Sequence, residues 1–267
     1  MDFLVKLAKA IRENRSFVCV GLDPDPSLMP EGLSVLDFNR AIIRATSEFA
    51  CAFKPNFAFY EASGIEGMTA LRETIKIIPP HIPVIADAKR SDIGNTAKAY
   101  ARGIFDHFGF DACTVNPYLG SDAVEPFLQY KDKGIFVLCR TSNAGAADFQ
   151  SLECETPEGT KKLYEIVAEK ANAWNKNGNV GLVVGATYPE ELKALRASYP
   201  DIPFLIPGIG AQGGDLTFTA KNGLDRERQR TVINSSRQIL YASRGSDFAE
   251  AAAKAARTMR DQINAVL

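Results

Sequence analysis

The chain has 267 residues, with 31 basic and 32 acidic side chains and a formal net charge of −1. A length near 250 residues is typical of one α/β barrel and suffices to bury a core without disulfides or a structural metal. The balanced charge argues against nucleic-acid binding, because it offers no basic field to a phosphate backbone. The chain also lacks an apolar run of the roughly 18 residues that a membrane span needs, which excludes a membrane protein.

The N-terminus and the cysteines predict a reduced, cytoplasmic protein. Residues 1–16 are amphipathic and charged throughout, which predicts a helix and not a signal peptide. The five cysteines form no CxxC pair, and four of them lie in or beside apolar runs, where a buried thiol is the usual state. We therefore expect a soluble protein without disulfides.

Eight short apolar runs alternate with helical stretches along the chain. Each run is nearly all apolar, as in parallel strands that are buried on both faces. The predicted strands are Phe17–Leu22, Cys51–Lys54, Pro83–Ala86, Ala112–Val115, Gly134–Cys139, Val180–Gly185, Phe204–Ile206 and Thr231–Asn234. The predicted helices are Asp37–Glu48, a segment from Ser121 to just before Tyr130, Glu158–Asn175, Glu190–Ser198 and Asp247–Val266.

The spacing of these runs predicts their arrangement. The polar residues that end them, from Asp23 to Asn234, recur at about 30 residues per step, as in a repeating βα unit. A doubly wound open sheet has the same alternation, but eight units with an N-terminal cover helix favour a closed barrel. We predict a single (β/α)8 TIM barrel over residues 1–267. Residues 143–160 have no clear period and follow a strand, where barrels carry lids and binding loops.

Ionisable residues end three consecutive predicted strands. Asp23 and Lys54 follow the first two strands, and Asp87 and Lys89 follow the third. Residues two apart on a strand face the same side, so Asp87 and Lys89 both point toward the barrel mouth. A local salt bridge explains any one of these charges. Four of them on adjacent strand ends favour a catalytic array, since a barrel's C-terminal rim carries its active site.

The charged array predicts chemistry without a metal. The chain has two histidines, His81 and His107, and neither follows a predicted strand, so no metal-ligand cluster accompanies the array. A lysine ammonium held between carboxylates can sit beside a reacting carbon in a fixed charge state. Asp92 lies close by and has a local alternative role as the cap of a helix that opens near Ile93.

A glycine-rich segment, residues 207–214 (PGIGAQGG), follows the seventh predicted strand. Glycines let backbone N–H groups approach an anion closely. The phosphate site of a barrel commonly comes from the loops after strands seven and eight, and the eighth strand is followed by Arg237. Arg244 is the second candidate for the cation. The predicted phosphate ligands are the backbone of Gly208, Gly210 and Ser236 and the side chains of Gln212 and Arg237.

Residues 87–93 (DAKRSDI) fit the D-x-K-x-x-D signature of the orotidine 5′-phosphate decarboxylases, which related sugar-phosphate decarboxylases and aldol-type synthases share. Further segments resemble the longer bacterial subgroup, namely FKPN at 53–56 with FYE at 59–61, NPYLG at 116–120, RTSNAG at 140–145 and PGIGAQGG at 207–214. The resemblance runs in order from about Phe17 to Ala242. Gln238 departs from it, since a glycine is expected there.

The resemblance implies a reaction and roles for the charged array. The reaction is the conversion of orotidine 5′-monophosphate to uridine 5′-monophosphate and carbon dioxide, the last step of UMP biosynthesis, without metal or other cofactor. Lys89 is then the general acid that protonates C6 of the pyrimidine. Asp87 and a partner subunit's Asp92 flank the substrate carboxylate, and Lys54 completes the array.

The resemblance also implies how the nucleotide is bound. Asp23 and Lys54 hold the ribose hydroxyls, assisted by Thr96 from the partner subunit. Ser142 contacts the pyrimidine, and Gln212 with Arg237 binds the phosphate. A site shared in this way implies a homodimer built around the barrel mouths, with no nucleic-acid or membrane partner.

Three alternatives remain open at this point. A magnesium-dependent sugar-phosphate decarboxylase or hexulose-phosphate synthase of the same superfamily shares the signature, but such proteins usually carry an acid where Lys54 stands. A Schiff-base aldolase would use Lys54 or Lys89 as its nucleophile. A barrel that binds a nucleotide without turning it over would leave the charged array unexplained.

Overall fold

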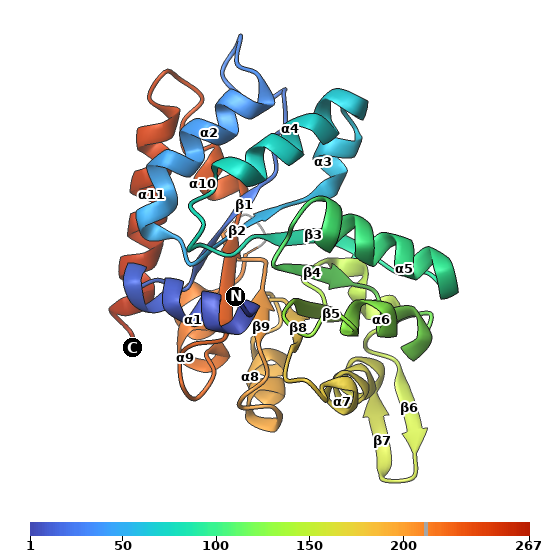
Figure 1. The fold of residues 1–267 in the computed structure, drawn as a ribbon. Helices are drawn as coiled ribbons and strands as arrows, with labels where there is room; N and C mark the ends of the chain where they lie inside the picture. Colours follow the sequence, from blue (N-terminus) through green and yellow to red (C-terminus); the bar gives the residue numbers. More distant parts are fainter. Residues whose placement is uncertain (211–212) are drawn as a thin grey trace.

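Eight parallel strands form a nearly closed barrel at the centre of the molecule (Figure 1). The computed structural model describes residues 1–210 and 213–267. The strands are β1 (Val18–Leu22), β2 (Ala52–Pro55), β3 (Ile85–Arg90), β4 (Ala112–Val115), β5 (Gly134–Arg140), β8 (Val180–Val184), β9 (Phe204–Ile206) and β10 (Thr231–Ser235). They pair in the order β2-β1-β10-β9-β8-β5-β4-β3, and bridges from Phe53 to Val84 and from Asn56 to Asp87 connect the two ends. All eight predicted strands and the barrel are confirmed.

Helices surround the barrel, as expected for strands that are apolar on both faces (Figure 1). The α-helices are α1 (Phe3–Asn14), α2 (Val35–Thr46), α3 (Phe57–Glu61), α4 (Gly64–Ile77), α5 (Gly94–Arg102), α6 (Ser121–Leu128), α7 (Leu163–Trp174), α8 (Pro189–Ser198), α9 (Leu216–Gly223), α10 (Arg237–Leu240) and α11 (Phe248–Asn264). Short helical turns η1 (Ser47–Phe49), η2 (Gly103–His107) and η3 (Ala144–Asp148) complete the set.

Helix α1 covers the N-terminal end of the barrel, as predicted. Its first residue, Phe3, is buried and meets the ring of Phe136 edge-on, with centroids 5.8 Å apart. A Cβ on Gly134 would lie 2.3 Å from the Phe3 ring, so the glycine at the start of β5 makes room for this contact. Lys6 also pairs with Asp111 at 2.8 Å. The opposite, C-terminal end of the barrel is therefore the open one.

The predicted helix Glu158–Asn175 begins later than expected. Residues 159–162 belong instead to an antiparallel hairpin of β6 (Glu153–Thr156) and β7 (Gly159–Lys162), which projects from the body beside α7 in Figure 1. Gly159 makes the turn with φ +114°, a conformation that favours glycine. Helix α7 then starts where the Glu165 carboxylate accepts the backbone N–H of Lys162 at 2.7 Å. The hairpin begins inside the segment 143–160, which has no clear period, and ends two residues after it.

Four of the five cysteines are buried, as expected for thiols in or beside apolar runs. Cys19, Cys51, Cys113 and Cys139 are buried free thiols, and Cys154 is half-buried. Among residues 1–210 and 213–267, no helix is both long enough and apolar enough to cross a membrane.

Candidate active site

A cavity of about 550 Å³ opens at the C-terminal ends of the barrel strands. Side chains or backbone from the ends of all eight strands reach it, as is general for the sites of such barrels. Its polar and charged lining consists of Asp23, Lys54, Asn56, Asp87, Lys89, Thr114, Thr141, Ser142, Asn143, Gln150, Asn234, Ser236, Arg237 and Gln238. Eight of the twelve residues predicted for the site, Gly208 among them, therefore meet in one cavity.

Asp87 bridges two lysines at the floor of this cavity. Its Oδ2 accepts from Lys54 Nζ at 2.7 Å and its Oδ1 from Lys89 Nζ at 2.6 Å. The Lys54 side chain is 4% exposed and that of Lys89 50%, so one ammonium is enclosed while the other faces the open cavity. The Thr114 hydroxyl adds a third donor to Asp87 Oδ1 at 3.2 Å. The predicted array thus forms within a single chain.

The backbone at the end of β3 is irregular where it presents Lys89. Ala86 pairs with Cys113 of β4, and Arg90 pairs with Val115. Four residue steps along β3 therefore correspond to only two along β4. Lys89 takes φ +46°, which is uncommon for a residue with a side chain, and its N–H donates to Thr114 Oγ1 at 2.9 Å. Irregular strand pairing next to an active site often changes the direction in which a side chain points. Here the irregularity directs Lys89 back toward Asp87.

The charges of the array stabilise one another. Burial lowers the pKa of Lys54, but the carboxylates of Asp87 and Asp23 outweigh it, and the pKa of Lys54 ends above its usual range. Burial raises the pKa of Asp87, but the ammonium groups of Lys54 and Lys89 outweigh it, and the pKa of Asp87 ends well below its usual range. At neutral pH the floor of the cavity therefore holds a carboxylate between two ammonium ions.

Asp23 lies beside this array on the turn after β1. Its Oδ1 is buried without a hydrogen-bond partner in the described part of the chain, so a ligand hydroxyl in the cavity would satisfy it. Two tyrosines fix the turn that carries it. Tyr60 donates to the Leu22 carbonyl at 3.1 Å, and Tyr241 donates to the Asp23 carbonyl at 2.9 Å while accepting the Asp25 N–H at 2.6 Å.

The far end of the cavity is built by the loops after β9 and β10. Gly208 has φ +100°, and its carbonyl accepts the Gly214 N–H at 3.0 Å, which closes the glycine loop on itself. Arg237, the first residue of α10, is exposed and lines the cavity. A Cβ on Gly21 would lie 1.9 Å from Ser236 Oγ, so the glycine in β1 lets this loop approach. A positive charge and backbone N–H groups suit an anion here.

Some predicted residues lie elsewhere. Gln212 falls outside the described residues. Gly210 does not line the cavity, and a Cβ there would lie 2.1 Å from Gln238 Oε1, so the unexpected glutamine occupies the space beside this glycine. Asp92 and Thr96 do not line this chain's cavity either. Asp92 accepts the Ile93 N–H at 2.8 Å, and Thr96 is exposed on α5.

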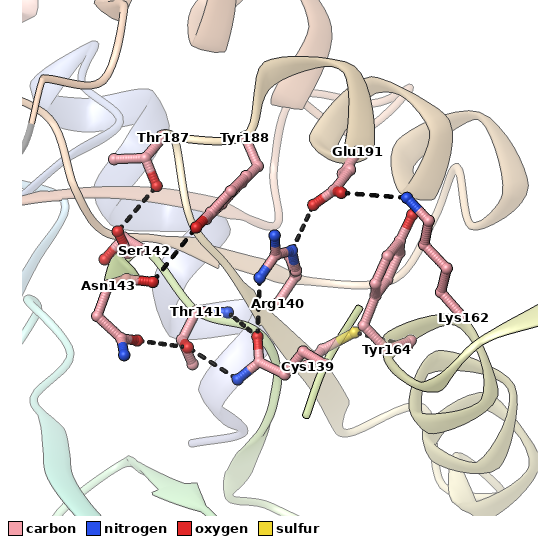
Figure 2. A network of polar contacts seen from close by, with 11 residues as sticks. Cys139, Arg140, Thr141, Ser142, Asn143, Lys162, Tyr164, Thr187, Tyr188 and Glu191 are labelled. Carbon is pink, nitrogen blue, oxygen red and sulfur yellow. Dashed lines mark hydrogen bonds and ion pairs between the residues drawn. The ribbon is translucent and has the colours of Figure 1, made fainter. Parts of the chain in front are cut away.

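A turn of three residues, Thr141–Asn143, follows β5 and forms one wall of the cavity. Thr187 and Tyr188, which directly precede α8, contact this turn, as Figure 2 shows. The Thr187 hydroxyl donates to the Ser142 carbonyl at 3.0 Å, and the Tyr188 hydroxyl donates to the Asn143 carbonyl at 3.3 Å. Gly185 lets the two segments touch, because a Cβ there would lie 2.8 Å from Ser142.

Sequence reasoning missed several lining residues. Thr114 lies inside an apolar run, and because threonine is common in strands, the sequence does not mark it as a site residue. The sequence pattern marks Asn234 only as the end of a strand. Its buried Oδ1 has no hydrogen-bond partner among the described residues. Gln150 lies in the stretch without period, and no sequence signal marks it. In the described part of the chain no three histidine, cysteine or acidic side chains form a metal-binding group.

An eight-stranded parallel barrel with a charged cavity at the C-terminal ends of its strands places the protein among the α/β barrels. The chain belongs to one family within that class. A model of the "Orotidine 5′-phosphate decarboxylase / HUMPS family" matches residues 16–255.

Individual relatives agree with the family. The chain is 59% identical over 264 residues to orotidine 5′-phosphate decarboxylase of Dehalococcoides mccartyi, covering 99% of this chain and 98% of that one. Its fold matches the structure of Leishmania donovani OMP decarboxylase with a TM-score of 0.87 and 42% identity, over 100% and 99% of the two chains. It also matches L. donovani UMP synthase with a TM-score of 0.89 and 44% identity, but spans only 56% of that longer chain.

Proposed function

We propose that this protein converts orotidine 5′-monophosphate to uridine 5′-monophosphate and carbon dioxide. The observation that carries the proposal is the carboxylate of Asp87 held between the ammonium groups of Lys54 and Lys89, at 2.7 and 2.6 Å. This array lies in the same cavity as Arg237 and the loop at Gly208. The names and identities of the relatives support the substrate.

The nucleotide spans the cavity in this proposal. Its phosphate lies at Arg237 and the backbone of Gly208 and Ser236, and Gln212 adds a donor. Its ribose hydroxyls face the unpartnered Asp23 Oδ1 and Lys54. The pyrimidine lies against the turn Thr141–Asn143, with Ser142 as its contact, and the substrate carboxylate points toward Asp87.

The reaction breaks the bond between C6 and the carboxylate carbon, and the electron pair stays on C6. Asp87 repels the substrate carboxylate, while the Lys89 ammonium stabilises the negative charge that develops at C6. Lys89 Nζ then gives a proton to C6, and the half-exposed amine regains a proton from solvent. The ring offers that electron pair no good sink, so the barrier lowering required lies near the top of the roughly 8–23 kcal/mol range of enzymes. Neither a metal nor another cofactor takes part.

The protein acts as a homodimer in this proposal, with each subunit a single barrel domain of residues 1–267. Asp92 and Thr96 lie on the loop and helix after β3 and do not line their own chain's cavity. They are flanked by Ile93, which is 59% exposed, and Tyr118 on the next loop is 81% exposed. Apolar side chains exposed in this way favour contact with a second copy, which would bring the partner's Asp92 and Thr96 to the site.

The absorbance of orotidine 5′-monophosphate with purified protein in EDTA tests the reaction. We expect the orotate chromophore to disappear and uridine 5′-monophosphate to accumulate at the same rate, without added metal. An unchanged spectrum from folded protein that still binds the nucleotide would contradict the proposal. Magnesium with pentulose or hexulose phosphates would then test the sugar-phosphate branch of the superfamily.

A further inference from the structure

A bulge in β5 turns the side chain of Arg140 out of the barrel. Leu138 pairs with Val183 of β8, and both side chains line the cavity. Regular alternation would place Arg140, two residues later, on the same side. The register shifts between Leu138 and Arg140, so that Arg140 pairs with Val184 instead. Its guanidinium therefore lies behind the cavity wall, against α7 and α8.

The guanidinium of Arg140 is almost completely enclosed there, with its side chain 2% exposed. Its Nε donates to Glu191 of α8, and its Nη1 donates to Gln150 Oε1 at 3.4 Å. Its Cζ lies 3.5 Å from the centroid of the Tyr188 ring. Figure 2 shows the cation between these groups. A buried charge is expensive unless it is fully paired, so this arrangement strongly constrains its partners.

The contacts of Arg140 reach the cavity turn from two sides. Gln150 Oε1, which faces the cation, also accepts the Thr141 N–H at 2.8 Å, and Gln150 Nε2 donates to Thr141 Oγ1 at 2.8 Å. The Thr141 hydroxyl in turn donates to Asn143 Oδ1 at 2.7 Å. On the other side, the Tyr188 ring that stacks on Arg140 holds the Asn143 carbonyl.

This chain of bonds has a direction, and two donors set it. Because Arg140 Nη1 and the Thr141 N–H can only donate, Gln150 turns its carbonyl oxygen toward them and its amide nitrogen toward Thr141 Oγ1. Thr141 then has a proton left for Asn143 Oδ1, so the amide nitrogen of Asn143 is the end that remains a donor. Asn143 lines the cavity, and a pyrimidine carbonyl is the acceptor that such a donor fits.

We propose that Arg140 is a positioning residue that fixes the turn Thr141–Asn143, and the donor direction along it, for the pyrimidine carbonyl groups. The inference rests on the proposed function and deepens it, because it concerns the base and not the phosphate. The arginine lies outside the cavity and acts through Gln150, whose amide bonds Thr141 with both its oxygen and its nitrogen.

Binding of uridine 5′-monophosphate and of ribose 5-phosphate, measured by calorimetry, separates this role from a general effect on the fold. Gln150→Leu removes the bonds to Thr141 but keeps the pair between Arg140 and Glu191. We expect about tenfold weaker binding of the nucleotide, as for the loss of one or two net hydrogen bonds, and unchanged binding of ribose 5-phosphate. Arg140→Lys keeps the charge but loses the planar fork, so it should give a similar loss.

The double variant Arg140→Lys/Gln150→Leu tests whether the arginine acts through the glutamine. If it does, the double variant binds the nucleotide no more weakly than Gln150→Leu alone, because coupled residues are not additive. Lys162→Met is the matched control. This lysine lies 3.7 Å from Glu191 and makes no hydrogen bond or ion pair with the turn in the described part of the chain, so we expect wild-type affinity.

Three outcomes would overturn the inference. They are wild-type nucleotide affinity in folded Gln150→Leu, a parallel loss of ribose 5-phosphate binding, and losses that multiply in the double variant. If Arg140→Lys does not fold, Gln150→Leu alone still tests the inference. Its affinity for uridine 5′-monophosphate should fall while its affinity for ribose 5-phosphate stays at the wild-type value. Wild-type protein that binds ribose 5-phosphate but not the nucleotide would instead refute the proposed function.

Discussion

The two ends of the cavity are built in opposite ways. At the floor, Lys54, Asp87 and Lys89 are bonded to one another, and Thr114 adds a further contact. At the rim, Arg237 is exposed, and its side chain makes no hydrogen bond or ion pair with the residues that the structure describes. The floor is therefore organised before a ligand arrives, whereas the rim cation obtains its partner from the ligand. The difference indicates that chemistry is assigned to the floor and affinity to the rim.

The largest expected effect comes from removing the floor's exposed ammonium. Lys89→Ala should lower kcat by about 10⁴-fold, the upper range for a general acid, because nothing else at that position gives a proton to C6. Asp87 keeps its bond to Lys54, so the melting temperature should stay close to that of the wild type. Turnover at saturating substrate and thermal unfolding measure both. Lys98→Ala on α5, an exposed lysine outside the cavity, is the control. Near-normal turnover in Lys89→Ala would contradict the role of Lys89.

The next effect concerns stability. Asp87→Asn leaves a buried ammonium without its carboxylate and should cost about 3–5 kcal/mol in the free energy of unfolding at pH 7. The pKa of Asp87 is lowered by folding, so its contribution is present above about pH 4, the ordinary value, and is lost as the pH falls toward the folded-state pKa. Urea unfolding at pH 7 and at a pH below about 4 measures this contribution to the free energy of unfolding.

The same unfolding experiment can contradict the account. The stabilities of wild type and Asp87→Asn should converge in acid, whereas a gap of constant size from pH 7 to acid would refute the ionic origin of the difference. Asp132→Asn, whose side chain is 60% exposed, should show neither the loss nor the convergence.

At the rim, Arg237→Ala should raise KM about 100-fold with kcat largely kept, since a charge-assisted bond contributes about 1.5–3 kcal/mol. Steady-state kinetics with orotidine 5′-monophosphate separate the two constants. Arg244→Ala is the matched control, because Arg244 is exposed nearby but does not line the cavity. An unchanged KM in Arg237→Ala, or a raised KM in Arg244→Ala, would contradict the assignment of the phosphate site to Arg237.

The smallest effect tests how the rim is packed. Gly21→Ala places a Cβ where Ser236 Oγ lies 1.9 Å away, so the loop that carries Ser236 must shift. We expect a cost of about 1–3 kcal/mol, typical of overpacking, and a moderately raised KM. Gly103→Ala, where a Cβ would meet no atom within 4 Å, should change neither value. Equal behaviour of the two variants in thermal unfolding and kinetics would argue against the close packing.

The sequence predicts the floor better than the walls. Lys54, Asp87 and Lys89 come at or after the ends of neighbouring apolar runs, so their meeting at one end of the barrel can be predicted from the pattern. The walls depend on departures from regular geometry. The bulge at Arg140 and the positive φ of Lys89 leave no trace in the hydrophobic pattern, and Thr114 is hidden in an apolar run.

Segments whose structure depends on distant contacts are also beyond sequence reasoning. The strand β7 falls within the predicted helix Glu158–Asn175, because the apolar periodicity outweighs the local signals of Gly159 and the cap at Glu165. Asp92 matches a family motif and Thr96 is implied by the resemblance, but neither lines this chain's cavity. The role proposed for them involves a second subunit, which a sequence pattern cannot position.

A single calorimetric comparison tests the division between floor and rim most directly. Uridine 5′-monophosphate lacks the carboxylate that reacts but keeps the phosphate, so its affinity reports the rim without the chemistry. We expect Lys89→Ala to bind uridine 5′-monophosphate with near wild-type affinity and Arg237→Ala to bind it about 100-fold more weakly. Equal losses in the two variants, or a larger loss in Lys89→Ala, would contradict the assignment of chemistry to one end of the cavity and affinity to the other.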